Sequence, residues 1–102
     1  MPLRIRPEVD GEVRAVLLTR TSVARAVAFE GAYRAAVARI AADPTSLSLH
    51  PEAAGPGVRY ISISGFPYIV LFRTTAPAET VVFAVLHTAA GPGQFRLAER
   101  RA

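Results

Sequence analysis

Residues 58–87 read VRYISISGFPYIVLFRTTAPAETVVFAVLH, and this stretch decides the fold of the chain. It holds three runs rich in β-branched and aromatic residues, separated by breaks at residues 64–67 and 75–78 that contain Pro. Runs of this composition, bounded by turn-forming residues, are typical of strands in an antiparallel meander. The stretch therefore predicts three consecutive strands, at about residues 58–63, 68–74 and 81–86.

The order of polar and apolar residues predicts where each strand lies. The third run, at residues 81–86, has no polar residue, and a strand that is apolar on both faces usually has neighbours on both sides. We therefore expect it in the middle of the sheet. In the first run, alternation places Arg59 and Ile61 on one face and Tyr60 on the other. Because Pro67 lacks an amide hydrogen, we expect it at the first position of the second strand.

Length and composition limit the class of protein. The chain has 102 residues, enough for one domain over residues 1–102 with a modest core. No apolar run is long enough to span a bilayer and no leader opens the chain, so we expect a cytoplasmic protein with no membrane partner. The chain has no Cys and only two His, at 50 and 87, which argues against a metal site. No motif predicts a cofactor.

The basic residues allow two interpretations. All twelve are arginines, and the formal net charge is +4. One interpretation is compositional, because a GC-rich genome favours Arg and Ala codons. The other is functional, because a basic surface attracts phosphate groups or an acidic protein. A charge of this size fits both, so a basic patch stays an open alternative.

The first half of the chain predicts one short strand and two helices. Residues 3–6 alternate apolar and basic side chains, and a proline then suits the first turn of a helix at about residues 8–19. Thr21-Ser22 offers a new N-cap, and a broad apolar stripe predicts a second helix to about Ala42. Asp43-Pro44 should stop this helix.

Two segments show no periodic pattern. Residues 45–57 are rich in Pro and Gly and should form a loop that is long for a compact domain. Residues 94–102 fit either one or two helical turns or a flexible, frayed tail. The order of elements is then strand, helix, helix and three strands. This order predicts an α+β fold with a small antiparallel sheet and a two-helix N-terminal arm packed on one face.

Four local sequence features follow one another between the second predicted helix and the last predicted strand. A helix ends in Ala-Asp43-Pro44, a loop leads to a strand that opens with Val58-Arg59, GFPYIVLFR follows at residues 65–73, and the last strand ends in Val85-Leu86-His87. In this order, from Leu3 to about Phe95, they resemble the RelE/ParE family of type II toxin–antitoxin toxins. The resemblance is to its ParE-like plasmid stabilisation proteins above all. It implies a growth-inhibiting toxin that a cognate antitoxin neutralises.

The resemblance implies one of two mechanisms. RelE-like members of the family cut mRNA on the ribosome with basic and aromatic side chains, whereas ParE-like members bind and poison DNA gyrase without chemistry of their own. Many members follow the terminal His with a small residue and one or two Arg. Here His87 is followed by Thr88-Ala89-Ala90, which removes positive charge where the family usually places it. This departure keeps open the possibility that the chain has lost its activity.

For the cutting branch, four side chains are candidate catalysts: His87, Arg59, Arg73 and Arg96. Metal-free RNA cleavage needs an acid, a base and cations that stabilise the charged phosphorus centre. His87 could be the acid or the base, because imidazole changes charge near neutral pH. The arginines would supply positive charge, but they offer His87 no titratable partner.

Each candidate also has a structural explanation. A His at the end of a buried strand often caps the strand or bonds to nearby backbone. Arg59 could pair with Glu52 or Glu79, and the head group of Arg73 could reach water beyond its apolar strand. The other histidine, His50, has no visible partner in its loop, so we expect it to be a surface residue.

The hypothesis is therefore a ParE-like toxin that is not an enzyme, with DNA gyrase as its target and an antitoxin as its partner. The alternative is a RelE-like, metal-independent endonuclease that acts on ribosome-bound mRNA. A third possibility is a relic that binds its antitoxin but has lost its activity. The sequence leaves open whether the chain forms a homo-oligomer or a hetero-oligomer with the antitoxin.

Overall fold

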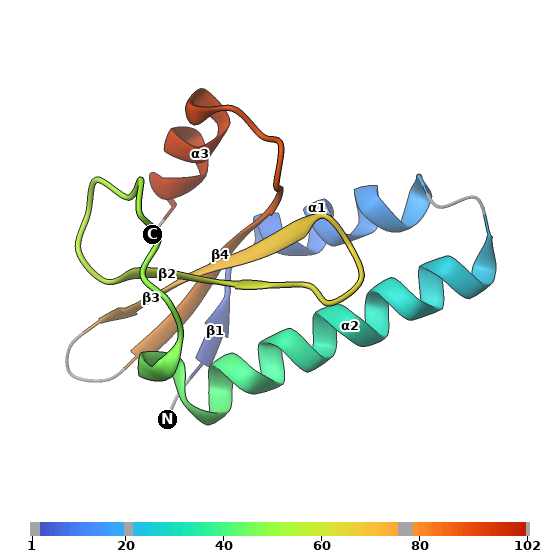
Figure 1. Cartoon of the computed structure of the whole chain (residues 1–102), viewed down its shortest axis with the longest axis horizontal. Coiled ribbons are helices and arrows are strands. Elements are labelled where there is room, and N and C mark those ends of the chain that lie inside the picture. The colour runs from blue at the N-terminus through green and yellow to red at the C-terminus, as the bar shows by residue number, and fades with distance from the viewer. Residues whose placement is uncertain (1–2, 20–21, 76–78, 102) are drawn as a thin grey trace.

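A computed structural model describes residues 3–19, 22–75 and 79–101 of the chain (Figure 1). Its elements are, in order, β1 (Leu3–Ile5), α1 (Pro7–Leu18), α2 (Val23–Ala42), the 3-10 turn η1 (Pro44–Ser46), β2 (Val58–Ser62), β3 (Tyr68–Thr75), β4 (Glu79–His87) and α3 (Pro92–Glu99). This is the α+β order expected from the sequence, followed by one more helix.

The three strands predicted from residues 58–87 form the expected meander. β2 runs antiparallel to β3, and β3 runs antiparallel to β4, with Tyr68 opposite His87. The sheet order β1-β4-β3-β2 places β4 between two neighbours, as its apolar composition predicts. Pro67 lies directly before β3 rather than at its first position. Residues 76–78 of the second predicted break lie outside the described residues.

The sheet is mixed, which corrects the expectation that all its strands are antiparallel. β1 runs parallel to β4, with Leu3 opposite Thr80 and Ile5 opposite Val82. The connection explains this direction. A tight turn forces two strands to be antiparallel, whereas α1 and α2 carry the chain from β1 to the opposite edge of the sheet, where β2 lies. A strand joined through helices is free to pair in parallel.

The helices begin and end close to the predicted positions. Pro7 opens α1, and the Ser22 side chain caps α2 by accepting a hydrogen bond from the Arg25 amide at 3.1 Å. Thr21, the other residue predicted for this cap, lies outside the described residues. Pro44 lies just beyond α2 and opens η1, so the predicted stop is confirmed.

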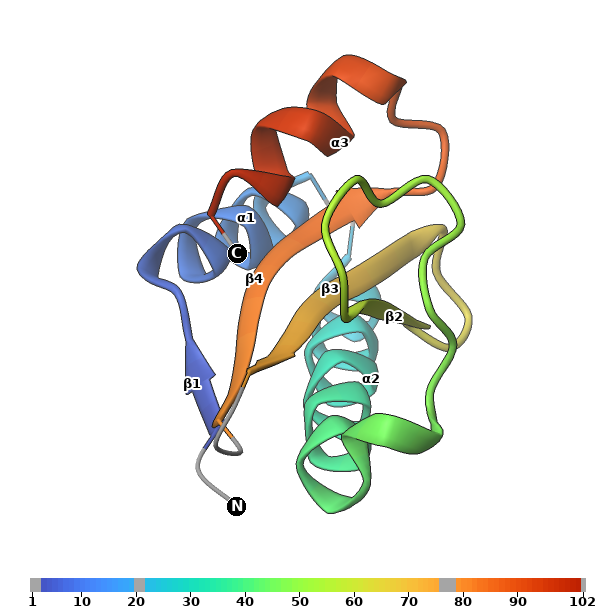
Figure 2. The same cartoon turned by 90° about the vertical axis from the view of Figure 1, so that its left-hand side faces the viewer.

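The sheet is covered on both faces (Figure 2). Phe29 of α2 and Phe72 of β3 are fully buried in the core that α1 and α2 form with one face. On the opposite face, Phe95 of α3 is buried with Leu71 of β3. The prediction of a two-helix arm on one face therefore accounts for α1 and α2. It misses α3, which forms from residues that the sequence left as a tail or a short helix.

The long loop before β2 is tied to the outer edge of that strand. The amides of His50 and Tyr60 donate to the carbonyls of Val58 and Ser48, at 2.9 and 3.1 Å. Gly57 ends the loop with a φ of +76°, a left-handed conformation that glycine adopts without steric cost. These bonds bring His50 to the face of the sheet that α3 covers.

Candidate functional site

The candidate catalysts His87 and Arg73 lie at opposite ends of the β3–β4 ladder. His87 is exposed at the end of β4, opposite Tyr68, whereas Arg73 is opposite Val81. Since a strand rises about 3.4 Å per residue, the distance between the two positions along the sheet is roughly 17 Å. At that separation both side chains would have to extend fully toward each other to contact one phosphate group.

The other two candidates lie elsewhere. The guanidinium of Arg59 donates to the Leu47 carbonyl, which holds the long loop against β2. Arg96 is exposed on α3, where it lines a shallow hollow of about 320 Å³ with Glu99 and Arg100. The described structure therefore does not bring the four candidates to one point, and a shared site for RNA cleavage does not follow from them.

His87 completes the end of its own strand. Its Nδ1 accepts a hydrogen bond from the Ala89 amide at 2.9 Å, which closes the turn after β4. Its ring meets the Tyr68 ring edge-on, with the centroids 5.1 Å apart. The structural explanation considered for this residue thus accounts for its polar contact and its packing. Because Nδ1 is the acceptor, the neutral ring carries its hydrogen on Nε2.

The ring of His87 ends a row of aromatic contacts on the face that α1 and α2 cover. Tyr68 meets Phe29 edge-on at 5.6 Å, and Phe29 meets Phe66 edge-on at 5.2 Å. The Arg25 guanidinium lies over the Phe66 ring, 4.7 Å from its centre. The row packs α2 against the sheet. At the end of β4, His87 also lines a cavity between the sheet, the loop and α3, so it is within reach of both faces.

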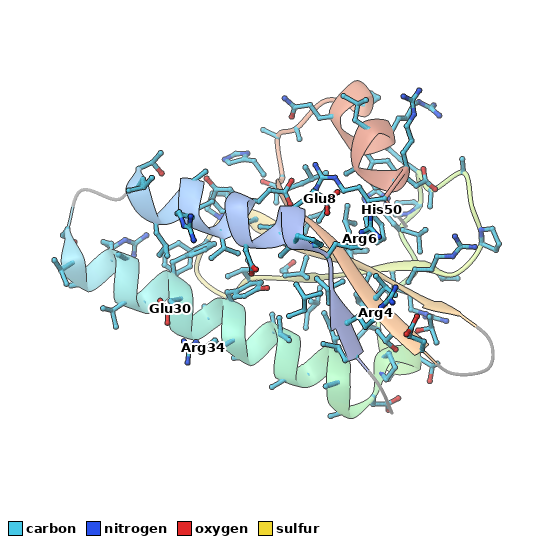
Figure 3. All side chains as sticks on the ribbon, turned by 180° about the vertical axis from the view of Figure 1, so that it is seen from behind. Arg4, Arg6, Glu8, Glu30, Arg34 and His50 are labelled. Carbon is cyan, nitrogen blue, oxygen red and sulfur yellow. The ribbon has the colours of Figure 1, made fainter. Side chains whose placement is uncertain are left out.

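His50 lies on the opposite face, and the expectation that it is an isolated surface residue is wrong. Its ring stacks on Phe95 of α3, with the centroids 4.3 Å apart and the planes inclined by 24°. It also meets Tyr60 of β2 edge-on at 5.4 Å. Figure 3 labels His50 where the loop passes close to α3. The only sequence signal for the contact of His50 with Tyr60 and Phe95 is the alternation of β2, which places Tyr60 on the opposite face from Arg59.

The rings of His50, Tyr60 and Phe95 line a cavity of about 330 Å³ between the sheet, the loop and α3, and the candidate catalyst His87 lines the same cavity. Nδ1 of His50 accepts the Glu52 amide at 3.2 Å, so Nε2 keeps its hydrogen and can donate. Among residues 3–19, 22–75 and 79–101, neither this Nε2 nor the Tyr60 hydroxyl has a hydrogen-bond partner. The aromatic walls suit a small flat ligand, and none of the described arginines lines the cavity.

The tip of the α1–α2 pair exposes three large apolar side chains. Leu18, Val23 and Val27 are 79%, 80% and 66% exposed. Leu18 is the last residue of α1, and Val23 and Val27 lie one turn apart at the start of α2. We name this surface the hairpin tip, and Figure 1 shows that this end of the helical pair projects beyond the sheet. Exposed apolar surface of this kind is typical of a contact site.

The arginines fall into two groups. Four are ion-paired, and Figure 3 labels two of the pairs, Arg6 with Glu8 and Arg34 with Glu30. A second group has no carboxylate within 4.0 Å in the part of the chain that the structure describes: Arg14, Arg25, Arg39, Arg59, Arg73, Arg96 and Arg100. The uncompensated positive charge is therefore spread over the helices and β strands rather than gathered at the His50 cavity.

Three further observations bear on the chemistry. Within the described residues, no three or more His, Asp or Glu side chains are grouped so that they could hold a metal ion. No helix in the same residues has both the length and the apolar surface that a membrane crossing needs. The chain matches no model of a known protein family, and no curated protein is significantly similar to it.

Proposed function

We propose that the chain is the toxin of a type II toxin–antitoxin module and acts as ParE-like toxins do, by binding a large target. By resemblance this target is DNA gyrase, and a cognate antitoxin neutralises the toxin. The observation that carries the proposal is the hairpin tip, where three large apolar side chains face solvent.

The hairpin tip suits a protein partner. The free energy falls when another surface covers exposed apolar side chains and removes them from water. Val23 and Val27 lie on one side of α2, which is how a helix presents anchor residues to a groove. Arg14 and Arg25 are exposed on the same two helices and lack ion pairs in the described structure. Their positive charge would attract an acidic protein and speed its association.

The positions of the candidate catalysts also favour binding over cleavage. Acceleration of phosphoryl chemistry depends on several groups that converge on one reacting centre. His87 and Arg73 are separated along β3, and Arg59 is bound to the Leu47 carbonyl. The part of the chain that the structure describes thus offers charge at several places without a cluster of the four candidates.

Expression tests the proposal first, and a pair of matched variants tests the surface. Induced expression should arrest bacterial growth, and the purified protein should inhibit supercoiling by gyrase. The double variant Val23→Gln, Val27→Gln should lose both effects yet fold normally, because Gln is the better helix former at an exposed position. Leu97→Gln is the matched control, since Leu97 is an apolar residue of α3 that is 60% exposed away from the tip.

The outcomes separate the alternatives. If the double variant inhibits gyrase as well as the parent does, the hairpin tip is not the contact surface. If gyrase is unaffected and growth still stops, the ParE-like assignment is wrong. If expression leaves growth unchanged, the inert antitoxin-binding relic is the better explanation.

A second candidate function is the RelE-like cleavage of ribosome-bound mRNA. The observation that favours it is the cavity between His50, Tyr60 and Phe95, because aromatic walls and an unpaired imidazole Nε2 suit an RNA base. In that case transcripts would be cut during translation, and His50→Ala or His87→Ala would abolish the cuts. Intact transcripts in growth-arrested cells would exclude this function.

A further inference from the structure

A groove runs between the C-terminal end of α2 and the outer edge of β2. It encloses about 380 Å³ and is lined by Arg39, Ser46, Leu47, Ser48, Tyr60, Ile61 and Ser62. The loop leaves η1 and rises past β2 here, as Figure 2 shows. Unlike the cavity beside His50, this groove has an arginine and three serines in its lining, and we refer to it as the Arg39 groove.

Several hydrogen-bond donors of the Arg39 groove are unused. The hydroxyls of Ser48 and Ser62 have no partner among the described residues. The Ser46 hydroxyl is occupied, because it donates to the Asp43 carbonyl at 3.0 Å. The groove thus keeps two hydroxyl donors free.

The edge of β2 adds a backbone donor. The Tyr60 amide points outward, since it donates to the Ser48 carbonyl at 3.1 Å. Amides two residues apart in a strand point to the same side, so the Ser62 amide also faces outward, beyond the last bond to the loop. The amide of Ile63 points the other way, to the Tyr68 carbonyl at 2.9 Å, as this alternation requires.

The charge of the groove is positive. Arg39 lies in the last turn of α2 and has no carboxylate within 4.0 Å in the described structure. The guanidinium of Arg59 contributes a second positive charge from behind the loop, where it bonds to the Leu47 carbonyl. Asp43, the acidic residue next along the chain, has its Oδ1 bound by the Thr45 hydroxyl at 3.3 Å.

We propose that the Arg39 groove binds the phosphate group of a small phosphorylated molecule. A guanidinium binds two phosphate oxygens at once, and hydroxyls and a backbone amide can serve the remaining ones. A carboxylate has only two oxygens and would leave some of these donors unpaired. The side chains of Leu47 and Ile61 provide an apolar wall for the rest of the ligand. This site is independent of the toxin's target and of the hairpin tip.

Nuclear magnetic resonance titration of the full chain tests the site with two probes, inorganic phosphate and adenosine monophosphate. The amide signals of Ser48 and Ser62 should shift and saturate with at least one probe. Arg39→Gln should weaken the binding about tenfold, the effect of losing a charge-assisted bidentate contact. Arg14→Gln is the matched control, because it removes the same charge from an exposed arginine of α1 and should change the affinity less than about twofold.

The two probes show whether the Arg39 groove recognises a free phosphate ion or the phosphate group of a larger molecule. Saturation by both shows that the phosphate group alone is recognised, and tighter binding of the nucleotide shows that the apolar wall contributes. Shifts spread over all exposed arginines, or equal losses in Arg39→Gln and Arg14→Gln, would overturn the proposal in favour of general charge attraction. Binding of a single-stranded oligonucleotide with no response to either small probe would overturn it too.

Discussion

Glu12 of α1 and Arg101, which follows α3, form an ion pair at 2.9 Å across the open edge of β4. β1 pairs with β4 only as far as Val82. Beyond that point Glu12 Oε1 accepts the Val85 amide at 2.9 Å, and Arg101 Nη1 donates to the Phe83 carbonyl at 3.3 Å. Two side chains from opposite ends of the sequence thus satisfy backbone groups that a longer β1 would have paired.

Glu12→Ala should lower the free energy of unfolding by about 2 kcal/mol, because it leaves the Val85 amide without its acceptor and Arg101 without its ion-pair partner. The side chains of the pair are only 23% and 26% exposed, so solvent screens them less than it screens a surface pair. Urea unfolding would measure the loss. Glu8→Ala is the control, since the Arg6–Glu8 pair at 3.7 Å is more exposed and should contribute less than about 0.5 kcal/mol. Equal losses would contradict the role of Glu12.

Tyr33 should make the protein less stable at alkaline pH. Burial raises the pKa of Tyr33 above its ordinary value of 10.0, and the negative charge of Asp10 raises it further. The folded chain therefore keeps the phenolic proton to a higher pH than the unfolded chain does. The stability that this difference in pKa contributes is fully present below pH 10.0. It is lost as the pH rises through the pKa of Tyr33 in the folded chain.

Tyr33→Phe should remove this part of the alkaline loss. The chain contains neither Lys nor Cys, so few other groups titrate in the same range. Unfolding in urea at several pH values between about 8 and 11 would show the difference, and Asp10→Asn should give an intermediate curve. If Tyr33→Phe follows the same curve as the parent, the pKa of Tyr33 does not control alkaline stability.

Phe95 should hold α3 on the sheet. It is 6% exposed and stacks on His50, whereas Leu97 on the same helix is 60% exposed. Phe95→Ala should lower the free energy of unfolding by about 3 kcal/mol, as other truncations of buried Phe do. It should also speed amide exchange throughout α3. Leu97→Ala should change the stability by less than about 0.5 kcal/mol. Slow exchange in α3 of the Phe95→Ala variant would show that other contacts suffice.

The features that sequence patterns predicted are local ones. The central position of β4 follows from the lack of polar residues at 81–86, and the start of α2 follows from the cap at Ser22. The parallel direction of β1 depends on where two helices deliver the chain. α3 depends on tertiary contacts of Phe95 and Ala98, since eight residues form no stable helix alone.

In the candidate site, too, local sequence patterns did not predict which distant residues come together. Residue type alone suggested that His87, Arg59 and Arg73 could act together, but the register of β3 and β4 separates His87 from Arg73. His50 looked isolated because its partners lie outside its own loop, Tyr60 in the strand that follows and Phe95 in a helix far along the chain. A loop without periodicity gives no indication of which face its side chains reach.

His87 allows the strand-end role to be separated from a catalytic one. Its Nδ1 accepts the Ala89 amide at 2.9 Å, and the side-chain oxygen of Asn can accept the same amide two residues on, although Asn cannot transfer protons. His87→Ala should therefore lower the free energy of unfolding by about 1 kcal/mol, and His87→Asn should recover much of that loss. Both variants should still arrest growth on expression. If His87→Asn is as stable as the parent but neither variant is toxic, His87 takes part in chemistry and a toxin that only binds its target is the wrong description.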